Sequence, residues 1–186
     1  MRVISGSAKG IRLASVPGKS TRPITDQVKE ALFNIIGPSI VGKTILDLFG
    51  GTGAVGIEAL SRGAEYAVFL DTNYKAYKII QQNLKTTGLE DYAAVHKKDA
   101  FTFLREEPEQ QFDFIYIAPP QYQDLWHKAM QELDQNPGWS GRWDSVIIQI
   151  HPKEFREDND YTNFKIYDRR EYGDTLLVFY ERILLE

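Results

Sequence analysis

The fold of this chain is decided by residues 45–56, which read Ile45-Leu46-Asp47-Leu48-Phe49-Gly50-Gly51-Thr52-Gly53-Ala54-Val55-Gly56. The apolar start predicts a short β-strand that ends at Asp47, and the glycines predict a tight turn before a helix that begins near Ala54. Glycine adopts positive φ without a steric penalty and lets a ligand approach the backbone closely. A helix N-terminus behind such a turn offers free N–H groups to a polar ligand. The stretch therefore predicts a ligand site at the carboxyl end of a strand, where open α/β sheets bind their ligands.

The glycine turn is compatible with two classes of ligand. The spacing Gly51-x-Gly53-x-x-Gly56 fits the dinucleotide fingerprint, and Asp71 follows about twenty residues on, at the end of the next strand. S-adenosylmethionine is the other candidate, because its ammonium and sulfonium groups would be attracted by the carboxylate of Asp47. A dinucleotide would bring its pyrophosphate toward that carboxylate, where like charges repel. Asp47 therefore favours S-adenosylmethionine over a nicotinamide dinucleotide.

Length and composition are those of one ordinary globular domain. The chain has 186 residues, of which 42% are hydrophobic and 26% charged, so it can bury a substantial core. It contains no run of eighteen apolar residues and no signal peptide at its start, so we expect a cytoplasmic protein that does not enter a membrane. The absence of cysteine excludes disulfides and a cysteine nucleophile. Three histidines without HxxxH-like spacing argue against a metal site.

Positive charge is concentrated at the start of the chain, although the net charge is −4. Residues 1–30 contain Arg2, Lys9, Arg12, Lys19, Arg22 and Lys29 against Asp26 and Glu30. Six minus two gives +4 for this segment and leaves −8 for the rest of the chain. A basic segment on an acidic body indicates either a nucleic-acid contact or an ordinary solvated surface.

Strands and helices alternate through most of the sequence. Residues 2–16 predict a β-hairpin, residues 17–24 a loop, and a helix follows from Thr25 or Asp26 to the stop at Gly37-Pro38. After the glycine turn we expect strands at 66–70, 93–96, 112–117 and 146–150, with helices at 73–87, 100–105 and 123–134. Strands at 164–167 and 176–180 leave no room for a helix between them, so they predict an antiparallel hairpin that turns at Tyr172-Gly173-Asp174.

The order of these elements predicts an α/β fold. Alternation from residue 44 to residue 150 implies a parallel sheet covered by helices. A terminal antiparallel hairpin is a mark of the class I S-adenosylmethionine-dependent methyltransferase sheet, which is Rossmann-like, more than of a nicotinamide domain. We therefore expect a basic N-terminal β-hairpin arm over residues 1–24 and a methyltransferase domain over residues 25–186.

Three stretches of the chain together resemble a known family. They are Arg22-Pro23-Ile24-Thr25-Asp26-Gln27-Val28-Lys29-Glu30-Ala31-Leu32-Phe33-Asn34, the glycine turn with Gly56-Ile57-Glu58-Ala59-Leu60-Ser61-Arg62-Gly63, and Tyr172-Gly173-Asp174-Thr175. They resemble the ribosomal RNA small-subunit methyltransferase D family, which methylates guanine N2 in 16S rRNA with S-adenosylmethionine. The resemblance covers nearly the whole chain. Its specific part is the first stretch, since many methyltransferases share the glycine turn.

The resemblance implies roles for residues of this chain. Asp47, Phe49, Gly50, Gly51 and Gly53 would hold the methionine end of S-adenosylmethionine, Asp71 the ribose hydroxyls, Asp99 the adenine amino group, and Thr72 and Ala100 would lie beside the adenine. On the residues alone, Asp71 and Asp99 are also explained as helix caps. Lys9, Arg12, Lys19 and Arg22 would contact RNA. The partner implied is small-subunit rRNA or an assembling small ribosomal subunit, bound by a monomer.

The predicted catalytic loop departs from the family pattern. The family has an acid or asparagine, two prolines and a tyrosine, whereas this chain has Ala118-Pro119-Pro120-Gln121, followed by Tyr122. The first side chain normally accepts a hydrogen bond from the exocyclic amine, which alanine cannot do, and the aromatic ring normally stacks on the flipped base. We expect backbone carbonyls of the loop to accept the bond instead, and Tyr122 or Trp126, one helical turn on, to provide the stacking face.

The sequence thus predicts an S-adenosylmethionine-dependent RNA methyltransferase that acts on the exocyclic N2 amine of a guanine in small-subunit rRNA. The reaction would need neither a metal nor a covalent intermediate. The alternatives are a methyltransferase with another acceptor, a non-catalytic protein that binds S-adenosylmethionine or RNA, and a nicotinamide oxidoreductase.

Overall fold

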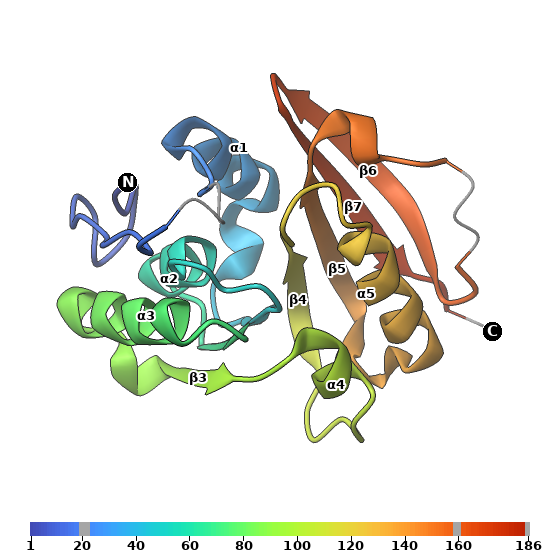
Figure 1. The fold of residues 1–186 in the computed structure, drawn as a ribbon, viewed down its shortest axis with the longest axis horizontal. Helices are drawn as coiled ribbons and strands as arrows, with labels where there is room; N and C mark the ends of the chain where they lie inside the picture. Colours follow the sequence, from blue (N-terminus) through green and yellow to red (C-terminus); the bar gives the residue numbers. More distant parts are fainter. Residues whose placement is uncertain (19–22, 158–160, 185–186) are drawn as a thin grey trace.

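A computed structural model describes residues 1–18, 23–157 and 161–184, and within them a seven-stranded sheet forms the centre of the molecule (Figure 1). Its strands are β1 (Thr44–Asp47), β2 (Tyr66–Asp71), β3 (Ala93–Lys97), β4 (Phe112–Ile117), β5 (Ser140–Ile150), β6 (Phe164–Tyr172) and β7 (Thr175–Arg182). They lie in the order β3-β2-β1-β4-β5-β7-β6. The first five strands are parallel, and β7 is antiparallel to both β5 and β6. The predicted parallel sheet with a terminal antiparallel hairpin is confirmed.

Helices cover both faces of the sheet (Figure 1). They are α1 (Asp26–Ile36), α2 (Ala54–Ser61), α3 (Tyr74–Thr87), α4 (Ala100–Leu104) and α5 (Leu125–Gln135), with short 3-10 turns η1 (Gly37–Ile40), η2 (Glu90–Tyr92), η3 (Pro137–Trp139) and η4 (Pro152–Glu154). Because side chains alternate along a strand, Ile45 packs with α1, α2 and α3 while Leu46 packs with α4 and α5. Within the described part of the chain, no helix combines the length and apolarity that crossing a bilayer requires.

Local capping explains where several helices begin. The Thr25 hydroxyl accepts a hydrogen bond from Val28 N at 3.2 Å at the start of α1, and Asn73 and Asp99 cap α3 and α4 in the same way. Helix α5 begins two residues later than predicted, because Asp124 precedes it with φ +56°. Strand β5 begins earlier than predicted, because Ser140 already pairs with Phe112 across a register shift.

The N-terminal hairpin predicted for residues 2–16 is confirmed only as a short antiparallel pairing: Arg2 bridges Arg12, Val3 N donates to the carbonyl of Ile11 at 2.9 Å, and Leu13 N donates to the carbonyl of Met1 at 3.1 Å. Backbone N–H groups of Ile4 and Ser5 donate instead to the carboxylate of Glu58, at 2.9 and 3.1 Å. The carboxylate of Glu58 on α2 thus satisfies amides at the point where the short pairing ends. Buried apolar residues of the segment, namely Val3, Ala8 and Leu13, join the core cluster of α1 and α2.

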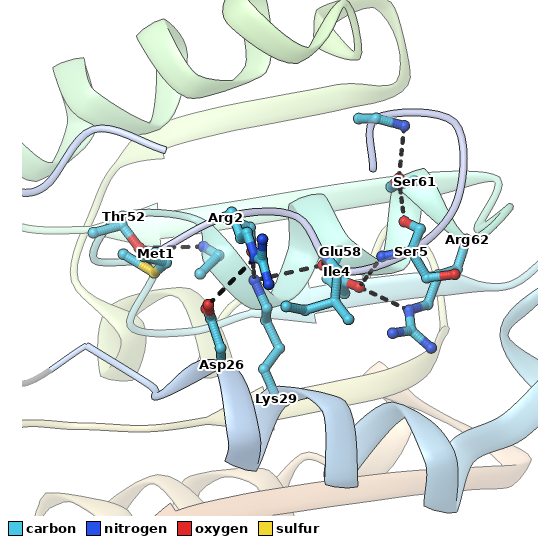
Figure 2. Close-up of polar contacts among 12 residues, drawn as sticks. Met1, Arg2, Ile4, Ser5, Asp26, Lys29, Thr52, Glu58, Ser61 and Arg62 are labelled. Carbon is cyan, nitrogen blue, oxygen red and sulfur yellow. Dashed lines mark hydrogen bonds and ion pairs between the residues drawn. The ribbon is translucent and has the colours of Figure 1, made fainter. Parts of the chain in front are cut away.

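A buried ionic cluster ties this segment to α1 and α2 (Figure 2). The side chains of Lys29 and Glu58 are fully buried, and Lys29 Nζ lies 3.5 Å from Glu58 Oε2. Lys29 Nζ also donates to the carbonyl of Arg2 at 2.5 Å, and Arg62 Nε donates to Glu58 Oε1 at 2.9 Å. Burial lowers the pKa of Lys29, and the charge of Glu58 opposes that shift. The cluster fixes where the N-terminal segment meets the domain.

Removing the acid of this cluster should destabilise the protein strongly. Glu58→Ala removes the acid nearest to the buried Lys29 and leaves two backbone N–H groups unpaired, so the free energy of unfolding should fall by about 3–5 kcal/mol. Denaturant titration measures it. The matched control is Lys43→Ala, which breaks a partly exposed pair with Asp113 and should cost about 1 kcal/mol or less. Equal losses in the two variants would contradict the structural role assigned to the cluster.

Candidate active site

The carboxyl ends of the parallel strands border a cleft with two adjoining compartments, of about 650 and 220 Å³. Both compartments are bordered by Pro23, Ile24, Phe49, Ala118 and Gln149, which therefore stand between them. The smaller compartment lies over the glycine turn and the start of α2, and the larger one extends past the ends of β2 and β3. The cleft lies at the edge of the sheet to which the parallel strands point, where the sequence predicts a ligand site.

Two glycines of the turn, Gly50 and Gly53, stand where a side chain would be crowded or strained. A Cβ on Gly50 would lie 2.7 Å from Ile80 Cδ1 and 3.2 Å from the carbonyl oxygen of Leu70. Gly53, the residue that precedes α2, has φ +80°, a conformation that L side chains rarely adopt. The turn therefore brings bare backbone to the wall of the smaller compartment.

Among the described residues, Asp47 is the acid that borders the smaller compartment. Its side chain is 2% exposed, and its Oδ1 has no hydrogen-bond partner among the described residues. Burial raises the pKa of Asp47 to about 8; the negative charge of Asp71 adds to the shift, and a hydrogen bond from the Phe49 backbone opposes it. A buried carboxylate with an unpaired oxygen beside a cavity is suited to receive a cationic ligand group.

The larger compartment brings together the other predicted ligand residues, Asp71, Thr72, Asp99 and Ala100. Asp71 accepts hydrogen bonds from Gly51 N at 3.0 Å and from Asn73 N at 2.8 Å, so it braces the glycine turn. Asp99 accepts from Thr102 N at 2.8 Å, which is the helix cap that its position also predicts. A carboxylate has about four acceptor positions, so these bonds leave each group free to bind a ligand as well.

The predicted catalytic loop forms a wall of the larger compartment, with Ala118, Pro119, Pro120 and Gln121 among the lining residues. Tyr122 does not border either compartment; its side chain is 66% exposed and its ring centroid lies 5.7 Å from that of His151. Tyr122 and Asp124 have φ of +62° and +56°, which is strained for residues other than glycine. Strain of this kind concentrates at functional sites.

The structure shows that the interpretation of Trp126 as a stacking residue is wrong. Its side chain is 1% exposed and stacks on Phe155, with ring centroids 6.3 Å apart and planes inclined by 21°. Trp126 belongs to the apolar face by which α5 packs on the sheet, so its ring cannot meet a base.

Sequence reasoning missed Gln149, which borders both compartments. Its Oε1 accepts a hydrogen bond from the hydroxyl of Tyr116. The signal was available, since Gln149 is the polar residue of the apolar strand 146–150. Pro23 and Ile24 were also missed, although they lie inside the stretch that carries the family resemblance.

The structure describes two of the four basic residues that are predicted to contact RNA. Lys9 and Arg12 are exposed, whereas Lys19 and Arg22 lie outside the described residues. Ser15, Val16 and Gly18 border the smaller compartment. Residues between Arg12 and the undescribed stretch therefore lie beside the cleft.

Comparisons with known proteins agree with the fold. The family model described as "Conserved hypothetical protein 95" matches residues 1–181. "Putative rRNA methyltransferase YlbH" of Bacillus subtilis (strain 168) is 39% identical over 184 residues, which cover 98% of this chain and 99% of the relative. "Ribosomal RNA small subunit methyltransferase D" of Escherichia coli (strain K12) is 33% identical over 150 residues, 81% of this chain and 73% of the relative. The solved structure "Putative methyltransferase yhhF from Escherichia coli" matches with a TM-score of 0.86 at 28% identity, over 98% of this chain and 97% of that one.

Neutralising the buried acid should stabilise the ligand-free protein. The pKa of Asp47 is about 8 in the folded chain against 3.8 for an ordinary aspartate, so the folded state holds a proton that the unfolded state loses. The free energy of unfolding that Asp47 contributes therefore falls as the pH rises from about 4 to about 8. Asp47→Asn removes this term, so the variant should exceed the wild type in stability at pH 8 and match it near pH 4.

Denaturant titrations at several pH values measure the difference between the two proteins. The control is Asp91→Asn, at an exposed position of η2, which should show no such pH-dependent gain. A gain for Asp47→Asn that does not depend on pH would contradict the assignment of the raised pKa to Asp47.

Proposed function

The chain belongs to the family described as Conserved hypothetical protein 95 and is a relative of ribosomal RNA small subunit methyltransferase D, and we propose that it is an S-adenosylmethionine-dependent rRNA methyltransferase. Its substrate atom is the exocyclic N2 amine of a guanine in small-subunit rRNA. The observation that carries this proposal is the unpaired oxygen of Asp47 beneath the glycine turn, next to a second compartment walled by the proline loop.

The residues of the cleft fit S-adenosylmethionine. The carboxylate of Asp47 would pair with the ligand's ammonium, and the bare backbone of Gly50, Gly51 and Gly53, beside Phe49, would lie along its methionine end. Asp71 would accept from the ribose hydroxyls and Asp99 from the adenine amino group, with Thr72 and Ala100 beside the ring. An ammonium ion would supply the partner that the buried Oδ1 of Asp47 lacks.

When bound, S-adenosylmethionine supplies an electrophilic methyl group: the amine nitrogen bonds to the methyl carbon, the carbon–sulfur bond breaks with its electron pair going to sulfur, and the amine releases a proton to water. The protein contributes by orienting the amine and excluding bulk water. The peptide groups Ala118–Pro119 and Pro119–Pro120 contain no N–H, so they present only carbonyl acceptors to an amine. Tyr122 would have to turn toward the cleft to stack on the base.

The substrate is proposed to be held by the basic N-terminal segment. Lys9, Arg12, Lys19 and Arg22 would contact phosphates of the rRNA, either free or within an assembling small subunit, and phosphate contacts position RNA without reading its sequence. We propose a monomer that acts in the cytoplasm. A second candidate, a non-catalytic protein that binds S-adenosylmethionine or RNA, is favoured by a single observation, the alanine at position 118.

Calorimetry should detect S-adenosylmethionine binding with a dissociation constant in the micromolar range, about −8 kcal/mol. Because the ammonium pairs with the ionised carboxylate and the pKa of Asp47 is about 8 in the free protein, affinity should rise from pH 6 to pH 8. At pH 7, titrations in buffers of different ionisation enthalpy should show that binding releases a proton. Asp47→Asn should abolish this release and weaken binding about tenfold or more, and Asp91→Asn should change neither. Tight NAD binding without binding of S-adenosylmethionine would overturn the cofactor assignment.

The catalytic proposal is tested with cofactor labelled in its methyl group, on small ribosomal subunits and on free rRNA. The wild type should transfer label to guanine N2, and Ala118→Asp should be equally or more active because it restores a side-chain acceptor. Tyr122→Ala should lower turnover about tenfold to a hundredfold if its ring stacks on the base, with cofactor binding unchanged. No transfer by the wild type together with clear transfer by Ala118→Asp would identify the natural protein as a non-catalytic binder.

A further inference from the structure

Gln149 is the neighbour of Ala118 across two adjacent strands. Ile117 of β4 pairs with Ile148 of β5 in parallel register, so the next residues, Ala118 and Gln149, come to lie side by side. Neighbouring strands are about 4.8 Å apart. Both residues border both compartments of the cleft. A long side chain on β5 therefore stands beside the position where the loop has only a methyl group.

The amide of Gln149 is held in place by Tyr116. The Tyr116 hydroxyl donates to Gln149 Oε1, and Tyr116 itself lies beside Asp47 across the β1–β4 pair. Burial, helped by the charge of Asp47, raises the pKa of Tyr116 well above its ordinary value, so the hydroxyl remains protonated and can donate. An amide oxygen has two lone pairs, so Oε1 can accept a second hydrogen bond from the cleft.

The segment that follows Gln149 also holds the proline loop. Glu154 accepts from Tyr122 N at 2.7 Å through Oε1 and from His151 N at 3.0 Å through Oε2. The end of β5 thus fixes both the position of the Gln149 amide and the course of the loop beside it. A substrate amine that reaches the loop carbonyls would also lie within the reach of Gln149.

We propose that Gln149 Oε1 accepts a hydrogen bond from the exocyclic amine of the substrate base, and so supplies from β5 the side-chain acceptor that position 118 lacks. This inference rests on the proposed methyltransferase function. Gln149 orients the nitrogen lone pair toward the methyl group and takes no proton, because a neutral amide is not a base at physiological pH; the amine proton still leaves to water. The cleft then has a side-chain hydrogen-bond acceptor for the substrate amine, although the proline loop contains no acid.

Gln149→Leu tests the proposal, because it keeps approximate size and removes the acceptor. Single-turnover methyl transfer should slow by about a hundredfold, the typical loss on removing one preorganised hydrogen-bonding group. The affinity for S-adenosylmethionine should remain near the wild-type value, whereas the melting temperature should fall because the buried hydroxyl of Tyr116 loses its acceptor. Gln149→Glu, which keeps an acceptor oxygen, should retain most of the activity. Gln82→Leu, at an exposed position of α3 outside the cleft, is the matched control and should behave as wild type.

A second substitution that restores activity to Gln149→Leu distinguishes an orienting role of Gln149 from a purely structural one. Adding Ala118→Asp to Gln149→Leu should restore methyl transfer, because the new carboxylate supplies the acceptor from the adjacent position. Full activity in Gln149→Leu, or a loss that Ala118→Asp does not restore, would overturn the role of Gln149 and leave the proposed function standing. Absence of methyl transfer by the wild type would instead overturn the proposed function itself.

Discussion

The buried carboxylate of Glu58 is the constraint on which the placement of the N-terminal segment depends. It accepts from Ile4, Ser5 and Arg62, and it lies beside the equally buried Lys29. Burying two charges is expensive, and a hydrophobic replacement of similar shape is often no less stable. The ionic cluster joins three segments, because Glu58 of α2 bonds to the N-terminal chain and lies beside Lys29 of α1, which donates to the carbonyl of Arg2. The continuation of that chain borders the cleft, so the cluster positions a wall of the site from outside it.

Asp47, in contrast to Glu58, lowers the stability of the folded protein. The fold gains nothing from a carboxylate that is buried, unpaired on one oxygen and raised in pKa to about 8. Similar costs are seen in the positive φ of Tyr122 and Asp124 at the end of the proline loop. Proteins tolerate local violations of this kind mainly where function requires them. Asp47 borders the cleft, and Tyr122 and Asp124 are next in the chain to Gln121 and Gln123, which line it. This proximity indicates a working site more strongly than the cleft's volume does.

Local patterns sufficed for the parts of the molecule that are built locally. The glycine turn, the start of α1 at Thr25 and the cap of α4 at Asp99 each depend on residues close in sequence, and their positions could be predicted. The short extent of the N-terminal hairpin could not, because amides of Ile4, Ser5 and Ala8 bond to Glu58 and Ser61, more than fifty residues away. Trp126 was misjudged because its spacing from the loop does not reveal which face of α5 packs on the sheet. Gln149 was missed because its position beside Ala118 depends on the register between β4 and β5, which local sequence patterns do not reveal.

The register between β4 and β5 explains why one half of the cleft can be recognised from the sequence more easily than the other. The half over the glycine turn comes mainly from one continuous strand-turn-helix segment, so its residues can be recognised from their spacing alone. The half at the proline loop is assembled from β4 and β5, whose pairing resumes at Phe114 and Ser145 only after a shift of register. Two side chains that lie next to each other in such a pair can exchange roles without any change in the backbone. Loss of a polar group at position 118 therefore removes an acceptor from the loop sequence, but it does not by itself remove an acceptor from the cleft.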